Sequence, residues 1–143
     1  MSRVINSSSP GSVRNAARRT IAEILRQMVA KRSLDGESRD MAAAIVLELD
    51  RIAGTIETTC DAWEKRNYFL KADRFRLEWE WVQPAADRLR DVIVDERWDQ
   101  APLELAKLLP RFADVRIAKM TRSSEAWDGA LAELLATANG GSS

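Results

Sequence analysis

The chain has 143 residues, 45% of them hydrophobic and 31% charged, and its 22 basic residues balance its 22 acidic residues. This length fits one domain with one core. The longest apolar run, Met41 to Leu47, is far shorter than the ~20 residues that a membrane-spanning helix needs. Histidine is absent, which removes the commonest general base and the commonest metal ligand. We therefore expect a soluble protein with no contact with the membrane and no resident metal.

Both ends of the chain are rich in Ser, Gly and Asn. We therefore expect mobile tails at residues 1–11 and 139–143, around a single helical domain at residues 12–138. The first residues lack the apolar stretch of a secretory signal, and the single cysteine, Cys60, cannot form a disulfide within the chain. These features predict a reducing, cytoplasmic setting.

Helical periodicity runs through nearly the whole chain, and no segment alternates apolar and polar residues as a strand would. We therefore expect an all-α bundle of four to five helices. The first helix should span about residues 12–32, with Ser12 as its N-cap. Its core-facing stripe consists of Val13, Ala17, Ile21, Ile24 and Met28.

The first helix is also basic. Residues 1–34 carry seven basic residues and one acidic residue, whereas the remainder carries 15 basic and 21 acidic residues. This asymmetry could attract nucleic acid or another acidic partner, or let the helix lie against the acidic remainder of the domain. The side chains concerned are Arg14, Arg18, Arg19 and Arg26. Because the chain as a whole is not basic, nucleic-acid contact is kept only as the alternative.

Residues 39–82 predict a second helix with apolar side chains at every seventh position, as in a helix that packs along a supercoiled seam. These side chains are Leu49, Ile56, Trp63, Leu70 and Leu77. Because no Gly or Pro lies between residues 55 and 83, we expect one long helix. A break near residues 66–67, which would give an up-down four-helix bundle, is the alternative.

Prolines mark the start of the remaining helices. Pro84 should open a helix over residues 84–98. Pro102 should open the last helical segment, residues 102–138, and Pro110 should bend or restart it. One helical phase continues from about residue 111 to 138, which predicts a single helix there that ends before Gly140.

The remaining side chains do not form a recognisable catalytic set. Cys60 has no second Cys or His to activate it, which indicates a structural residue. Asp87, Asp91 and Asp95 share one helix face, but this spacing is as typical of a solvated face as of a Mg²⁺ site. No glycine-rich phosphate-binding motif is present. We therefore expect a protein that is not an enzyme, with no catalytic residues and no cofactor.

Residues 61–82 hold six of the nine aromatic residues of the chain. Their apolar positions fall on two stripes at roughly opposite sides of a helix. The stripe that we expect to face the core consists of Tyr68, Ala72, Phe75, Trp79 and Val82.

The other stripe contains Leu70, Leu77 and Trp81, with Arg74 beside them. It either covers a second neighbouring helix or stays exposed as a protein interface, since Trp and Arg are enriched among interface anchors. A pocket for an apolar ligand between the helices is a further alternative. We expect a protein-binding role as an adaptor, assembly factor or small chaperone, and a homo-oligomer, most simply a homodimer.

Overall fold

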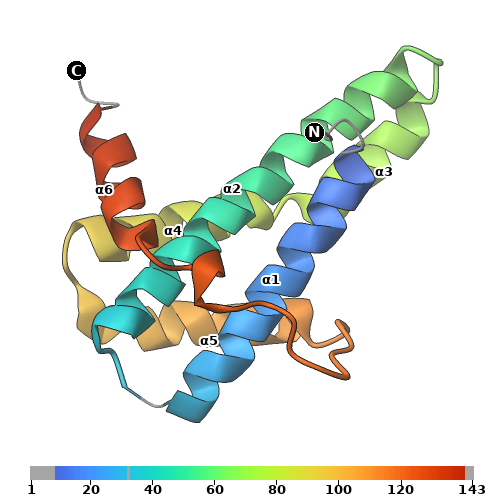
Figure 1. Cartoon of the computed structure of the whole chain (residues 1–143). Coiled ribbons are helices and arrows are strands. Elements are labelled where there is room, and N and C mark those ends of the chain that lie inside the picture. Colours follow the sequence, from blue (N-terminus) through green and yellow to red (C-terminus); the bar gives the residue numbers. More distant parts are fainter. Residues whose placement is uncertain (1–8, 32, 141–143) are drawn as a thin grey trace, which may run out of the picture.

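The computed structural model describes residues 9–31 and 33–140, and all regular secondary structure in these residues is helical. The prediction of an all-α helical bundle is confirmed. The α-helices are α1 (Pro10–Lys31), α2 (Gly36–Glu64), α3 (Phe69–Trp79), α4 (Val82–Val94), α5 (Ala101–Phe112) and α6 (Ala130–Gly140) (Figure 1). Short 3-10 helices, η2 (Trp98–Gln100) and η3 (Ser124–Ala126), precede α5 and α6.

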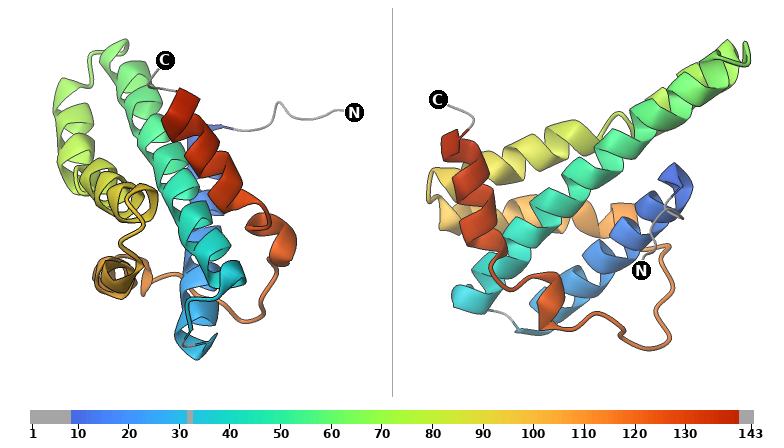
Figure 2. Two further views of the ribbon diagram at one scale, coloured as in Figure 1. Left: turned by 90° about the vertical axis from the view of Figure 1, so that its left-hand side faces the viewer. Right: turned by 45° about the horizontal axis from the view of Figure 1, so that its top comes forward.

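The central helix of the bundle is α2, against which α1, α3, α4 and α6 all pack. Figure 2 shows α3 and α4 on one side of α2 and α6 on the other. Near its N-terminus, α2 is buried on every side, because each of the six residues from Met41 to Val46 is at most 2% exposed. Three of the six are alanines, which leave room for helices on several sides.

The expectation of one helix over residues 39–82 is wrong, and its alternative, a break near residues 66–67, is confirmed. α2 ends at Glu64, α3 begins at Phe69, and the chain reverses direction between them (Figure 1). Asn67 has a φ of 65°, a left-handed conformation that Asn tolerates better than most residues. The amides of Asn67 and Tyr68 donate to the carbonyls of Glu64 (2.9 Å) and Trp63 (2.9 Å). These two bonds close α2 as they do in a glycine-terminated helix, so the break requires neither Gly nor Pro.

The expectation of a single helix over about residues 111–138 is also wrong. α5 ends at Phe112 and α6 begins at Ala130. Between them, residues 113–123, which we call the strap, follow an irregular path that contains no helix. Met120, which shares the apolar phase of the predicted helix, is 43% exposed in the strap. The apolar periodicity that continues from residue 111 to residue 138 therefore does not indicate a single helix.

The ends of the first and last helices differ slightly from those expected. α1 begins at Pro10, and its N-cap is Ser9 instead of Ser12, because the Ser9 hydroxyl accepts a hydrogen bond from the Ser12 amide (3.1 Å). α6 continues to Gly140, two residues into the expected tail. The rest of the expected tails, residues 1–8 and 141–143, lies outside the described residues. Among the described residues, no helix is long and apolar enough to cross a membrane.

Candidate protein interface

One face of α3 fixes this helix to α2. Ala72 is fully buried, and the Phe75 ring meets Trp63 edge-on with 5.1 Å between the ring centroids. At the edge of this contact, Arg76 forms an ion pair with Glu64 (2.8 Å). These contacts leave the opposite face of α3 turned away from α2.

That opposite face carries Leu70, Arg74 and Leu77, which we call the α3 outer face. Leu70 and Leu77 are 62% and 66% exposed. Within the described part of the chain, Arg74 has no ion-pair partner. Three of the four predicted interface residues thus lie together on one exposed surface of α3.

An open hollow of about 770 Å³ adjoins the α3 outer face at the turn between α2 and α3. Tyr68 and Phe69 line this hollow and are 51% and 55% exposed. The expectation that Tyr68 faces the core is therefore wrong. Tyr68 precedes the first residue of α3, so it does not follow the stripe to which Phe75 and Trp79 belong. Both of these rings are half-buried against the core.

Trp81 does not share the α3 outer face. α3 ends at Trp79 and α4 begins at Val82, so the chain changes direction at residue 81. The Trp81 ring stacks on Trp79 (6.2 Å between centroids) and meets Phe112 of α5 edge-on (5.8 Å). The guanidinium of Arg111 lies 4.7 Å from the Trp81 ring centroid. Trp81 is thus half-buried and joins α3 to α5.

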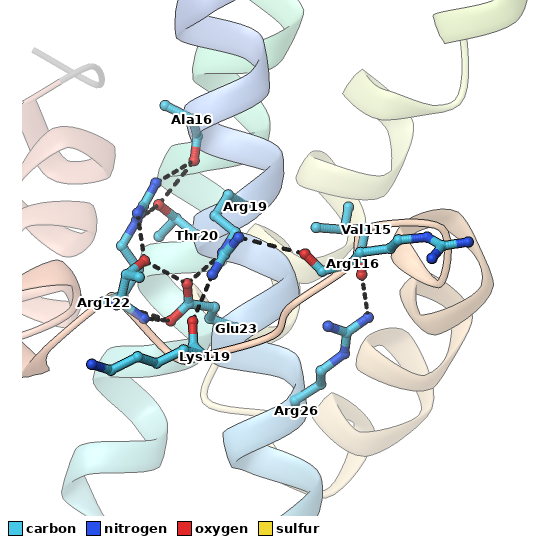
Figure 3. Close-up of polar contacts among 10 residues, drawn as sticks. Ala16, Arg19, Thr20, Glu23, Arg26, Val115, Arg116, Lys119 and Arg122 are labelled. Atoms are coloured by element: carbon cyan, nitrogen blue, oxygen red, sulfur yellow. Dashed lines mark hydrogen bonds and ion pairs between the residues drawn. The ribbon is translucent and has the colours of Figure 1, made fainter.

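The four arginines that were candidates for contact with nucleic acid or an acidic partner all donate to acceptors of this chain. Their hydrogen bonds join Arg14 to Thr55 (3.2 Å), Arg18 to Asp114 (2.7 Å), Arg19 to the Lys119 carbonyl (2.7 Å) and Arg26 to the Val115 carbonyl (2.7 Å). Three of these acceptors belong to the strap, as Figure 3 shows for the carbonyls that Arg19 and Arg26 contact. α1 therefore uses its basic face within the domain, which counts against free phosphate contacts.

A buried carboxylate, Glu23, holds the other end of the strap. Its side chain is 0% exposed and accepts from Arg19 Nε (2.6 Å), the Thr121 amide (2.8 Å), the Thr121 hydroxyl (2.9 Å) and the Arg122 amide (2.8 Å) (Figure 3). Burial alone would raise the pKa of Glu23, but the donors on Arg122, Arg19 and Thr121 outweigh burial and lower the pKa to about 2. Glu23 therefore remains charged and fastens the strap to α1.

Sequence reasoning missed Glu23. The available signal is its position as the only acidic residue among residues 1–34, directly beside Ile24 of the core-facing stripe. An acidic residue at such a position is buried only when donors surround it. The Arg122 guanidinium completes the attachment, since it donates to the Thr20 hydroxyl (2.9 Å) and the Ala16 carbonyl (3.2 Å).

A second hollow, of about 500 Å³, lies between the C-terminal end of α1 and α5. Its lining includes Leu25, Met28, Leu105 and Leu109, together with Ser33. This hollow does not lie among the aromatic residues 61–82, where a pocket for an apolar ligand was the alternative prediction. Among the described residues, no charged side chain lines it, so this lining does not select a ligand class.

The acidic row on α4 does not form a site. Asp87 pairs with Arg90 (2.7 Å) and Asp95 with Arg97 (3.3 Å). In the part of the chain that the structure describes, no group of three or more His, Cys, Asp or Glu side chains is placed to hold a metal ion. Cys60 is free and fully buried, and burial raises the pKa of its thiol, which makes it a poor nucleophile.

No protein-family model, curated protein or solved structure matches this chain. Its function must therefore be inferred from its own residues and their geometry.

Proposed function

We propose that this protein is not an enzyme and that it acts by binding a protein partner on the α3 outer face, as an adaptor, assembly factor or small chaperone does. The proposal depends on the exposure of Leu70 and Leu77, at 62% and 66%, on a firmly anchored helix. Single exposed leucines are common on protein surfaces. Here, two leucines share one helix surface that adjoins the exposed rings of Tyr68 and Phe69, and a contiguous apolar patch of this kind is typical of an interaction site.

The position of the patch on a well-fixed element supports this proposal. The α2–α3 turn is closed by the two backbone bonds at Asn67 and Tyr68, and Arg76 ties α3 to both Glu64 (2.8 Å) and Glu57 (3.5 Å). A patch that is ordered before binding loses little conformational entropy when a partner docks. Exposed aromatic and Arg side chains beside it suit an interface anchor.

Two other parts of the proposal depend on Cys60 and on the arginines of α1. A cytoplasmic setting is consistent with the free, buried thiol of Cys60. The alternative of nucleic-acid binding through α1 is not favoured, because the guanidinium groups of its four candidate arginines already donate to the domain itself.

Site-specific photo-crosslinking tests the proposed function. A photoreactive amino acid replaces Leu77 in the full chain, which is then irradiated in the cells that produce it. The matched control places the same amino acid at Leu103 of α5, which is 62% exposed and does not adjoin α3. We expect a discrete protein adduct from position 77 and none from position 103, and mass spectrometry identifies the crosslinked protein.

A second substitution makes the result specific to the patch. Leu70→Glu, introduced together with the photoreactive residue at position 77, should abolish the adduct because it places a charge in the centre of the apolar contact. The proposal is contradicted if position 77 gives no adduct, if position 103 gives the same adduct, or if Leu70→Glu leaves the yield unchanged.

A further inference from the structure

The side chains on and beside the α3 outer face form a self-complementary pattern. Leu70 and Leu77 lie seven residues apart, or two helical turns, and Lys71 and Glu78 lie seven residues apart along one flank of the same face. Each pair has one member near the start of α3 and one near its end. The members of the apolar pair are alike, whereas the members of the charged pair have opposite charge.

A second α3 in antiparallel orientation would satisfy both pairs at once. If a twofold axis passes midway between Leu70 and Leu77, Leu70 of each copy lies opposite Leu77 of the other. The same operation brings Lys71 of each copy beside Glu78 of the other, and the twofold symmetry repeats every contact. A parallel arrangement around a twofold axis would instead place the Lys71 and Glu78 flanks of the two copies on opposite sides of the contact, where these charges do not meet.

The flanking charges are available for such contacts. Among the described residues, neither Lys71 nor Glu78 takes part in an ion pair. The Lys71 ammonium lies 4.5 Å from the Trp63 ring centroid, at the border of the apolar patch. By contrast, Arg76 on the inner side of α3 is already paired with Glu64 (2.8 Å).

The geometry points to a second copy of this chain as the partner, docked antiparallel on the α3 outer face so that two α2–α3 hairpins meet around a twofold axis. This inference rests on the proposed function and names its partner. α3 has 11 residues and is therefore only about 16 Å long. Such a short helix buries less area than a standard interface, so the dimer should be weak, with a Kd in the micromolar range.

Sedimentation equilibrium of the purified full chain, from about 1 µM to about 0.5 mM, tests this inference. Lys71→Glu and Glu78→Lys should each weaken dimerisation roughly tenfold, because each change turns two attractive contacts per dimer into repulsive ones. The double variant Lys71→Glu/Glu78→Lys exchanges the two charges and should restore the wild-type Kd to within about threefold. Leu77→Glu should give a monomer, whereas the equally exposed control Leu103→Glu should dimerise like the wild type.

The outcomes separate this inference from the proposed function. The second copy is refuted if the wild type stays monomeric at about 0.5 mM, or if the double variant is no better than the single variants. A monomeric wild type that still gives a position-77 adduct with a different protein refutes the second copy and leaves the proposed function in place. Dimerisation that persists in Leu77→Glu refutes the antiparallel α3 contact. Circular dichroism of each variant verifies that its helices have formed.

Discussion

Replacing Glu23 with Gln should lower the free energy of unfolding by about 3–4 kcal/mol at neutral pH. The Glu23 side chain is 0% exposed and accepts four hydrogen bonds from α1 and the strap. Its pKa falls from 4.5 to about 2, which corresponds to about 3–4 kcal/mol at about 1.4 kcal/mol per pKa unit. Gln keeps the shape of the side chain, but its amide nitrogen would face a donor on Arg19, Thr121 or Arg122.

The loss should depend on pH in a defined direction. The pKa of Glu23 in the folded state, about 2, lies below its ordinary value of 4.5, so the charged carboxylate stabilises the folded state. This stabilisation is complete above the unfolded-state pKa and is lost as the pH falls from about 4.5 towards 2. The difference in stability between the wild type and Glu23→Gln should therefore shrink across this range. The exposed Asp35, whose pKa is also lowered to about 2 by the Ser38 amide and Lys31, titrates in both proteins and cancels from the difference.

Urea unfolding followed by tryptophan fluorescence, repeated between pH 7 and pH 2.5, measures this difference. Glu125→Gln is the matched control, because it removes an exposed carboxylate close to the strap and should change the stability by less than about 0.5 kcal/mol. Hydrogen exchange at the Thr121 and Arg122 amides should accelerate in Glu23→Gln alone. A cost below about 1 kcal/mol, or a cost that is the same at pH 7 and pH 3, would refute the role given to the Glu23 carboxylate.

Three further predictions concern the α2–α3 turn, the thiol and the basic helix. Asn67→Gly should leave the stability unchanged or raise it by up to about 1 kcal/mol, because Gly adopts a φ of 65° without strain. Asn67→Val should lower the stability by about 1–2 kcal/mol. Thermal unfolding compares the two variants, and a Val variant more stable than the Gly variant would contradict the turn geometry. Cys60 should react with a thiol reagent only as fast as the helices around it separate, because the thiol is buried and burial raises its pKa. Rapid labelling in the absence of denaturant would contradict this and would show that α3 leaves α2 easily. A fluorescent single-stranded oligonucleotide at low salt should not bind, because the α1 arginines contact their own domain; binding that weakens with salt and with Arg18→Ala would restore the nucleic-acid alternative.

Apolar periodicity was sufficient to predict the helical class and most of the core. Ile21, Ile24, Leu49 and Ile56, which set the stripes of the first two predicted helices, are all buried. Burial follows from spacing because one face of a helix must pack on its neighbours. The same signal left the break near residues 66–67 only as an alternative, because this helix end depends on a single backbone conformation at Asn67, where two local hydrogen bonds reverse the chain.

The strap shows a second reason why prediction failed. Its apolar spacing suits a helix, yet its polar groups bond to α1, and the partners of Glu23 lie 98 and 99 residues away along the chain. Contacts of this range outweigh a local preference for helix, which amounts to only a fraction of a kcal/mol per residue. Glu23 could be suspected as the lone acid in a basic segment, but its partners could not be named without the fold.

The prediction of the candidate interface was likewise correct within a helix and wrong beyond its end. Leu70, Arg74 and Leu77 were grouped correctly because they lie within α3, where helical spacing holds. Trp81 was grouped with them by the same spacing, but it lies beyond the end of α3 and packs on Phe112. A stripe read from sequence is therefore reliable only as far as the helix continues, and the end of α3 is not marked by Gly or Pro.

The two faces of α3 separate the stability of the hairpin from its capacity to bind. Ala72, Phe75 and Arg76 hold α3 on α2, and none of them belongs to the outer face. Changes at Leu70 or Leu77 remove no buried contact within the domain, because both side chains are mostly exposed. A loss of association after such a change therefore reports on the interface and not on folding. This separation is what makes the exposed leucines, and not the buried aromatic rings, the decisive positions for testing function.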